Sequence, residues 1–510
     1  MNGPSVNSRL GKVCAVIAEE TVDAARAAMN NAETVADLIE LRLDFLRDFD
    51  FADASALANL LEGKSLPVII TCRSAAEGGR QEVDDPVRLR LLVEGARRFA
   101  DYCDIEAAHY DQAIALSPDL SRLIVSYHNF ERTPVDLDAV YNRITALPAG
   151  IHKIVTHANT ITDSLAILEL LDRARREGRQ LIAIAMGLAG VITRVLGPSR
   201  GSFLTYGSIA SGKESAAGQP TCDELTGLYR IRRLSRETNI TGIIGSPVAH
   251  SASPAMHNRA FAELGLDFVY LPLEVHDVAG FVRRMVRPDS RDLDWNLRGF
   301  SVTIPHKTTI IPLLDQLDET ARAVGAANTV VVRDGSLIGY NTDVIGAMAP
   351  IERAVEIKGL RCGVIGAGGA ARAVIHGLLE RGAAVIVFGR DPEKARAVAE
   401  PLKVDILPIA SLASSDVTVV INTTPVGMRG HSEGQSPVPR SAWRGRAVAY
   451  DLVYNPLETR FLADARAEGC QTISGIDMLV AQAAYQFELW TGEKPPIEAM
   501  RESACLRVKP

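Results

Sequence analysis

The chain has 510 residues, 47% of them hydrophobic and 23% charged, which is typical of a soluble globular protein with two or three domains. Its net charge of −7 argues against a nucleic-acid partner, which needs a basic face, and every apolar run is too short or too interrupted by charge to cross a membrane. Seven cysteines without a C-x-x-C pair, and a start without an apolar segment, predict no metal site, no secretory signal and a cytoplasmic location.

The N-terminal half predicts eight strands with helix-like segments between them. The strands are short and apolar, and we place them at 13–18, 38–45, 68–72, 102–107, 123–128, 153–156, 181–186 and 203–206. This alternation over about 200 residues is typical of a (β/α)₈ barrel, with a doubly wound open sheet as the alternative. Ionisable residues within or just after the strands favour the barrel, whose active site gathers at the strand ends. They are Glu40, Arg42, Arg73, Glu106, His128, Lys153 and Arg194.

Lys153 lies within an apolar strand, where an ammonium is costly unless it is paired or neutral. One interpretation is a lysine that snorkels from the strand end. The other is a Schiff-base lysine, whose pKa is lowered by desolvation and neighbouring cations so that the amine attacks a ketone. His128 has a suitable pKa to remove a proton beside the resulting iminium and to protonate a leaving hydroxyl, although a single strand-end histidine is more often structural.

Residues 10–230 resemble a type I 3-dehydroquinate dehydratase. The similarity follows the family's order through 39–44, 71–79, 125–130, Lys153, 186–187, 193–194 and 215–219. It implies that Lys153 forms an imine with the C3 ketone, and that His128 removes the C2 proton and helps expel the C1 hydroxyl as water. It also implies that Arg194 binds the substrate carboxylate and that Glu77 orients Arg73 or His128. The implied contacts to ring hydroxyls are Glu40, Arg42, Arg73, Ser215 and Gln219.

The second half begins with a strand at 240–244 and a proline-punctuated loop that carries Ser251 and Ser253. Either serine can cap the next helix, and both hydroxyls together can bind a carboxylate. Farther on, Lys307 and Asp343 each follow a strand. In proximity they form a charge-assisted pair that can pass a proton to a developing alkoxide, whereas as a surface salt bridge they mean little.

A glycine-rich turn at 366–369 follows a short apolar strand and precedes a helix. This pattern is typical of a turn that binds a dinucleotide pyrophosphate, although a glycine turn occurs in any α/β domain. The next strand ends at Gly389 and Arg390, where an NAD-binding domain usually has an acidic residue. A cation there suits a 2′-phosphate, so we predict NADP, with Asp391 as a neighbouring acid.

Residues 240–505 resemble shikimate dehydrogenase. The matching stretches are 251–254, 302–307, 325–329, 341–343, 366–372, 422–428, 451–456 and 475–482. The resemblance implies that Lys307 and Asp343 are the catalytic pair and that the two serines bind the substrate carboxylate. Further substrate contacts are implied for Thr303, Asn328, Tyr454 and Gln482. The implied NADP-binding residues are Gly366, Ala367, Gly368, Gly369, Ala370, Arg390, Lys394, Thr423, Met428 and Gly475.

The two resemblances together imply a plant-like fused enzyme of the shikimate pathway. We expect a barrel at 10–230, a substrate-binding domain at 240–348 completed by 478–505, and a Rossmann domain at 356–477. The barrel is expected to dehydrate 3-dehydroquinate to 3-dehydroshikimate, and the second half to reduce that ketone to shikimate with NADPH. The alternatives are a class I aldolase, an NAD-dependent quinate dehydrogenase, and a quinate- or shikimate-sensing regulatory protein. The oligomeric state is not specified by the sequence.

Overall fold

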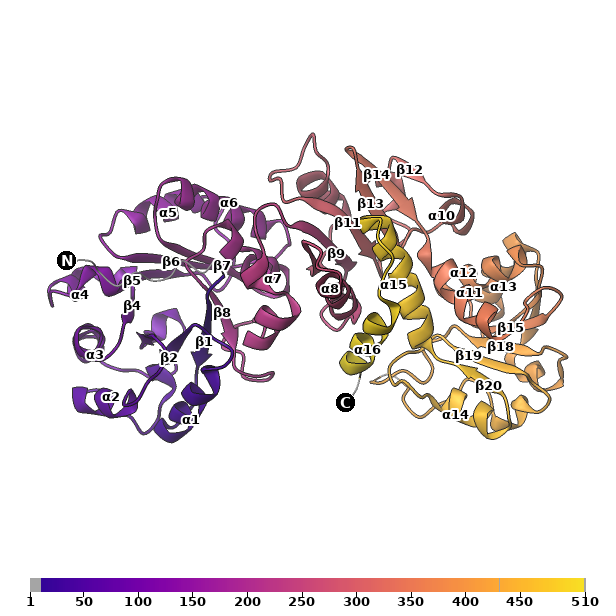
Figure 1. The fold of residues 1–510 in the computed structure, drawn as a ribbon, viewed down its shortest axis with the longest axis horizontal. Helices are drawn as coiled ribbons and strands as arrows, with labels where there is room; N and C mark the ends of the chain where they lie inside the picture. Colours follow the sequence, from indigo (N-terminus) through magenta and orange to yellow (C-terminus); the bar gives the residue numbers. More distant parts are fainter. Residues whose placement is uncertain (1–10, 431, 509–510) are drawn as a thin grey trace. The chain divides into compact units, whose positions relative to one another are not determined.

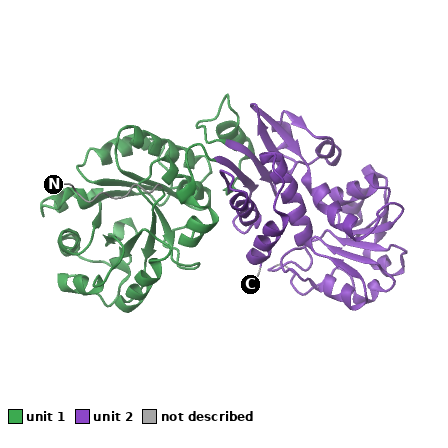
Figure 2. Cartoon of the chain, in the orientation of Figure 1, with its two compact units in different colours: residues 1–238, 271–296 green, residues 239–270, 297–510 purple. Residues whose placement is uncertain are grey.

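Three β-sheets organise the chain in the computed structural model, which describes residues 11–430 and 432–508 (Figure 1). Residues 1–10, on which the expectation of no secretory signal rests, lie outside the described residues. The chain forms two units: the first runs to Thr238 and includes Leu271–Asn296, and the second comprises Asn239–Tyr270 and Leu297 onward (Figure 2). Within the described ranges, no helix is long and apolar enough to span a membrane.

The first unit is built on an eight-stranded sheet of order β7-β6-β5-β4-β3-β2-β1-β8 in which every neighbouring pair is parallel. The two end strands approach each other, because Leu181 of β7 forms a parallel bridge with Ser202, just before β8. This arrangement confirms the predicted barrel and excludes the open sheet. The strands are β1 Val13–Ile17, β2 Leu38–Arg42, β3 Val68–Thr71, β4 Tyr102–Glu106, β5 Leu123–His128, β6 Ile151–His157, β7 Leu181–Met186 and β8 Thr205–Ser208.

Helices follow the strands, and their apolar faces are buried; α6, for example, buries Leu165, Leu168 and Leu171. The helices of this unit are α1 Val22–Ala32, α2 Ala54–Leu60, α3 Asp85–Arg98, α4 Tyr110–Ile114, α5 Leu137–Thr145, α6 Asp163–Arg176, α7 Val191–Leu196 and α9 Val278–Phe281. The strand predicted at 38–45 ends earlier, at Arg42, because Leu43–Phe45 forms a 3₁₀ turn.

Strand periodicity places the polar residues inside the barrel. Successive side chains of a strand alternate between the two faces, so residues two apart share a face. Leu38, Ile69, Ile124 and Ile182 belong to one buried apolar cluster. The residues two or four positions later on their strands therefore point the same way, nearer the carboxyl ends. Those later positions include Glu40, Thr71 and His128, so the apolar layer supports a polar layer above it.

The second sheet has six strands in the order β10-β9-β11-β13-β14-β12 and combines a parallel β9–β11 pair with antiparallel β11–β13–β14 pairing. The strands are β9 Asn239–Gly245, β10 Phe268–Glu274, β11 Leu297–Val302, β12 Gln316–Leu317, β13 Thr329–Arg333 and β14 Ser336–Tyr340. Helices α8 (Ser253–Glu263), α15 (Gly475–Thr491) and α16 (Ile497–Val508) share one buried cluster that includes Met256, Phe487 and Met500. The C-terminal helices therefore contribute to the core beside this sheet. Helix α10 spans Glu319–Val324.

The third sheet is entirely parallel, in the order β17-β16-β15-β18-β19-β20. Apolar clusters lie on both faces, since the consecutive residues Val364 and Ile365 belong to different clusters. The strand order reverses between β15 and β18, which is where a doubly wound sheet binds its ligand and which confirms the predicted Rossmann-type sheet. The elements are β15 Arg361–Ile365, β16 Ala384–Gly389, β17 Asp405–Pro408, β18 Val419–Asn422, β19 Val448–Asp451, β20 Gln471–Ile473, α11 Thr342–Ala354, α12 Gly369–Glu380, α13 Pro392–Ala399 and α14 Arg460–Ala467.

Candidate active sites

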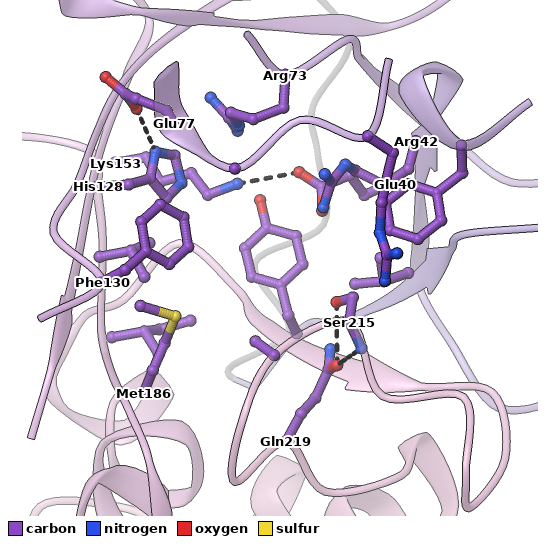
Figure 3. Close-up of a pocket in the computed structure, with 18 of the residues that line it drawn as sticks. Glu40, Arg42, Arg73, Glu77, His128, Phe130, Lys153, Met186, Ser215 and Gln219 are labelled. Atoms are coloured by element: carbon purple, nitrogen blue, oxygen red, sulfur yellow. Dashed lines mark hydrogen bonds and ion pairs between the residues drawn. The ribbon is translucent and has the colours of Figure 1, made fainter. Parts of the chain in front are cut away.

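A cavity of about 220 Å³ opens in the barrel and collects the polar side chains from the strand ends (Figure 3). The eight catalytic and substrate-binding residues predicted for this half line it, as does Glu77, whereas Glu106 is not among its lining residues. The eight are Glu40, Arg42, Arg73, His128, Lys153, Arg194, Ser215 and Gln219. They come from β2, β5, β6, α7 and the segments after β3 and β8. The barrel therefore brings together groups that lie up to 179 positions apart, from Glu40 to Gln219.

Lys153 lines this cavity with only 4% of its surface exposed. Its Nζ donates to Glu40 Oε1 at 3.0 Å and to Asp104 Oδ2 at 2.9 Å. The snorkelling interpretation is wrong, because the ammonium is inside the barrel and paired. The groups that accept hydrogen bonds from Nζ are carboxylates, and the neighbouring cations Arg42, Arg73 and Arg194 line the same cavity.

Asp104 is a site residue that the sequence reasoning missed. It is 1% exposed and accepts hydrogen bonds from Lys153 and, at 2.6 Å, from Ser126 Oγ. Burial opposes its charge, but the Arg73 guanidinium and the Lys153 ammonium hold the pKa of Asp104 well below its usual range. The sequence feature that indicates Asp104 is its position two residues before Glu106 on the same strand, which places both acids on one face.

Two arginines of the cavity, Arg42 and Arg73, are held by acidic partners. Arg73 Nη1 lies 3.0 Å from Asp104 Oδ1 and 3.4 Å from Glu106 Oε1, while Arg42 forms a two-pronged pair with Asp44 at 2.9 and 2.8 Å. A planar guanidinium held in this way presents its remaining N–H groups in a defined direction.

His128 and Glu77 form a partly buried pair, with His128 Nδ1 2.8 Å from Glu77 Oε2 (Figure 3). Burial, with the positive charges of Arg73 and Lys153, holds the pKa of His128 well below 6.5. Burial also raises the pKa of Glu77 to about 7. Below about pH 7 the pair therefore holds one shared proton, and the imidazole of His128 stays uncharged.

Arg194 differs from Arg42 and Arg73, because no carboxylate of the described chain pairs with it. It is 2% exposed, its Nε has no partner among the described residues, and Nη1 reaches only the Tyr206 carbonyl, at 3.5 Å. Burial lowers its pKa to about 10, which leaves the guanidinium positively charged at neutral pH. A buried cation without an internal counter-charge is suited to bind an anionic group of a ligand.

The second unit holds another cavity, of about 300 Å³. The eight substrate and catalytic residues predicted for this half all line it: Ser251, Ser253, Thr303, Lys307, Asn328, Asp343, Tyr454 and Gln482. Ser301 and Gln486 also line it and were missed, although Gln482 and Gln486 are four residues apart on α15 and so share a face.

Lys307 and Asp343 are in contact, with Nζ 2.6 Å from Oδ2. Their side chains are 33% and 14% exposed, so the pair is partly sheltered and is not a surface salt bridge. Asn328 Nδ2 donates to the other carboxylate oxygen, Oδ1, at 2.8 Å. Asn328 thereby fixes the Asp343 carboxylate, whose other oxygen contacts the Lys307 ammonium and orients it toward the cavity.

Ser251 and Ser253 lie where α8 begins. Ser251 Oγ accepts from the backbone N–H of Ser253 at 3.2 Å, so this hydroxyl satisfies one of the free donors at the helix start. Both serines nevertheless line the cavity. The capping and ligand-binding interpretations are therefore compatible for Ser251.

A third cavity, of about 690 Å³, lies along the parallel sheet of the second unit and includes Gly366, Ala367, Gly368, Arg390 and Lys394. Gly366 has φ +117°, and a Cβ there would lie 2.5 Å from Thr423 Oγ1, so the turn requires glycine. Around Gly368, by contrast, a Cβ would meet nothing within 4 Å. The turn thus leaves open space in front of the N-terminus of the 12-residue helix α12.

The other predicted cofactor residues are distributed more widely. Gly369 begins α12, and Ala370 and Gly475 line the cavity that holds Lys307. Thr423 Oγ1 donates to the Ile365 carbonyl at 2.8 Å, beneath the glycine turn. Met428 is 39% exposed and is not among the residues that line either of these two cavities. Among the residues that the structure describes, no group of three or more His, Cys, Asp or Glu side chains could hold a metal.

Sequence comparisons match four stretches to known families. Residues 13–236 match Type I 3-dehydroquinase, and residues 243–330 match the shikimate dehydrogenase substrate binding domain. Residues 475–505 match the shikimate 5′-dehydrogenase C-terminal domain. Residues 361–429, which include the glycine turn, match NADP oxidoreductase coenzyme F420-dependent.

The relatives include proteins that are similar to both halves. The chloroplastic bifunctional 3-dehydroquinate dehydratase/shikimate dehydrogenase of Arabidopsis thaliana is 36% identical, over 95% of this chain and 83% of that protein. The shikimate biosynthesis protein AroDE of Chlamydia pneumoniae is 29% identical, over 94% of this chain and 95% of that one. A crystal structure of shikimate 5-dehydrogenase from Thermus thermophilus with NADP(H) and shikimate is 35% identical over 53% of this chain and 99% of that one, with a TM-score of 0.48.

Proposed function

Because this chain belongs to the family of bifunctional 3-dehydroquinate dehydratase/shikimate dehydrogenases, we propose that it catalyses two consecutive reactions of the shikimate pathway. Residues 10–230 dehydrate 3-dehydroquinate to 3-dehydroshikimate. Residues 240–348, completed by 478–505, then bind that ketone, and residues 356–477 bind the NADPH that reduces it to shikimate. The observation that carries the proposal is that one chain has two separate cavities, one with a buried lysine beside a histidine and one with a lysine–aspartate pair.

In the dehydratase, the Lys153 amine attacks the C3 ketone of the substrate and forms an imine with loss of water. Glu40 and Asp104, both within 3.0 Å of Nζ, hold the lysine in place, and the ammonium must lose a proton to solvent before the amine can attack. His128 then removes the C2 proton and returns it to the C1 hydroxyl, which leaves as water. Arg194 holds the substrate carboxylate, since it is a buried cation without a carboxylate partner in the described chain.

The pH dependence of dehydration follows from the His128–Glu77 pair. When the pair loses its proton, the Glu77 carboxylate accepts from Nδ1–H and leaves Nε2 free to act as a base. While Glu77 is protonated, its O–H donates to Nδ1, and Nε2 carries the hydrogen instead. Because the pKa of Glu77 is about 7, we expect kcat/KM for dehydration to fall as the pH falls below about 7.

The Glu77→Gln variant tests this assignment. An amide does not titrate, so the acid limb should then follow His128 alone, whose pKa lies well below 6.5. Initial rates of dehydration, measured from mildly acidic to mildly alkaline pH, should show a lower maximum and an acid limb that has moved to lower pH. An unchanged limb would mean that the pair does not control the reaction.

In the dehydrogenase, Ser251 and Ser253 bind the substrate carboxylate, while Asn328, Thr303 and Gln482 contact its hydroxyls. Lys307 donates a proton to the oxygen of the ketone as it becomes an alkoxide, and Asp343 holds the lysine in position. NADPH supplies the hydride for this reduction. The glycine turn and the α12 N-terminus fit its pyrophosphate, and Tyr454, Ala370 and Gly475 lie on the cavity wall where the ring of the substrate is held.

NADP selection is proposed to depend on Arg390 and Lys394. Both side chains are exposed at the third cavity, and the nearby Asp391 caps α13 by accepting from the backbone N–H groups of Glu393 and Lys394. Its carboxylate is therefore engaged by the helix, which leaves Arg390 to bind the 2′-phosphate.

Arg390→Ala should raise the KM for NADPH by about tenfold or more, because it removes a charge-assisted hydrogen bond worth at least about 1.5 kcal/mol. The KM for NADH should be unchanged, because NADH has no 2′-phosphate. Both constants are measured from the rate of nicotinamide oxidation with saturating 3-dehydroshikimate. Arg396→Ala is a matched control, because Arg396 lies on α13, pairs with Glu400 and does not line the cavity. Equal losses in the two variants would contradict the assignment.

The experiment that tests the whole proposal gives the purified chain 3-dehydroquinate and NADPH together. We expect NADPH consumption that ends in shikimate, with NADH as the parallel test. If added 3-dehydroshikimate is reduced but 3-dehydroquinate is not, the barrel has another activity, such as an aldolase. If neither compound is reduced, a sensing role is the better explanation.

We also propose a cytoplasmic location, since all seven cysteines are free thiols.

A further inference from the structure

Tyr206 is a cavity residue to which neither the sequence motifs nor the proposed mechanism gives a role. It lies on β8 and is two positions from Leu204, with which it shares the apolar layer of the barrel. Its side chain lines the dehydratase cavity with 5% of its surface exposed. The Lys153 Nζ lies 4.4 Å from the centre of its ring, so the ring forms a wall beside the atom that attacks the substrate.

The phenol oxygen of Tyr206 is buried and has no hydrogen-bond partner within the described chain. Its polar neighbours are paired: Glu40 accepts from Lys153 and Thr71, and Asp104 accepts from Lys153 and Ser126. Burial, reinforced by the negative charge of Glu40, raises the pKa of Tyr206 well above 10, so the group remains a protonated donor. A buried hydroxyl without a partner is costly, and phenylalanine would provide the same ring without that cost.

We propose that Tyr206 contacts the substrate of the dehydratase, donating a hydrogen bond from its phenol to an oxygen at or beside the carbon that becomes bonded to Lys153. This inference rests on the dehydratase function proposed above. The ring places the phenol next to Nζ, and a substrate that carries a ketone and several hydroxyls brings an acceptor to this wall. The carboxylate is held elsewhere, by Arg194, so the phenol contacts the part of the ring on which the imine forms.

Tyr206→Phe removes one oxygen and keeps the ring. In the full chain, we expect kcat/KM for dehydration of 3-dehydroquinate to fall about tenfold, as the loss of one hydrogen bond in the transition state predicts. The thermal midpoint of the variant should equal or exceed that of the wild type, because the buried hydroxyl has no partner to lose. Reduction of 3-dehydroshikimate, measured in the same preparation, should be unchanged.

Tyr127→Phe is the matched control. Tyr127 lies on β5, is adjacent to His128, does not line the cavity, and accepts from Asn129 Nδ2 at 3.5 Å, so its dehydration rate should match the wild type. An unchanged kcat/KM in Tyr206→Phe, or a loss that is accompanied by a lower thermal midpoint, would overturn the inference. A wild type that does not dehydrate 3-dehydroquinate would instead refute the proposed function.

Discussion

Lys153→Ala should lower kcat for dehydration by more than about 10⁴-fold, because it removes the nucleophile on which every later step depends. Reduction of 3-dehydroshikimate should continue at the wild-type rate, since the two cavities share no lining residue. The dehydration rate is followed by the ultraviolet absorbance of the conjugated product. The reduction rate is followed by NADPH absorbance in the same preparation.

The alanine variant also removes the cation between Glu40 and Asp104. Glu40 then loses its ion-pair partner while Asp104 keeps its pair with Arg73, and we expect a cost of about 3 kcal/mol or more of stability. Lys153→Arg separates this effect from the chemistry, because it keeps a positive charge but has no amine that can form an imine. Both variants should be inactive in dehydration. Borohydride added with 3-dehydroshikimate should reduce the imine and attach the ligand covalently to the wild type but to neither variant. Dehydration by the arginine variant would contradict the imine mechanism.

The barrel was predictable because the sequence patterns that indicate its strands are local. Each strand is a short apolar run, and the alternation of side chains along it indicates which residues point inward. The same alternation places Asp104 on the same face of β4 as Glu106, two positions farther along the strand. The residues at the strand ends were therefore predictable as a group.

Their pairing was not predictable, because it depends on the register between strands. Ser126 of β5 lies opposite Glu106 of β4 on one side and Lys153 of β6 on the other. This register sets three inward residues at one level of the barrel and brings the Lys153 ammonium to Asp104. A shift of one residue would turn these side chains to the other face. The carboxylates that accept from Lys153 were not foreseen for this reason, because spacing along the chain carries no information about cross-strand neighbours.

The segment around Arg390 and Asp391 is a second place where the sequence does not specify which partner a side chain contacts. Asp391 follows Arg390 directly, and the sequence alone leaves open which of them faces a ribose phosphate. The structure shows that Asp391 accepts from two backbone N–H groups at the start of α13. A residue that caps a helix and one that binds a ligand can have the same sequence signature.

Lys307→Ala should lower kcat for reduction of 3-dehydroshikimate by about 10³-fold, within the range measured for loss of a general acid. Lys307 is the one ammonium among the residues that line this cavity, so no other lysine there can supply the proton. Asp343→Ala should cause a similar loss, because it leaves the lysine without the carboxylate that holds it at 2.6 Å. Rates are measured from NADPH absorbance, with dehydration in the same preparation as the internal control.

The double variant distinguishes a working pair from two independent contacts. If Asp343 acts only by holding Lys307, then once the lysine is gone the aspartate has nothing left to hold, and the double variant should be no slower than the slower single variant. If each residue acts independently, the two losses should multiply to about 10⁶-fold. Asp343→Asn adds a finer test, because an amide can still accept from Lys307 but no longer carries the charge that opposes the ammonium. A rate between those of the wild type and Asp343→Ala would show that position and charge both contribute.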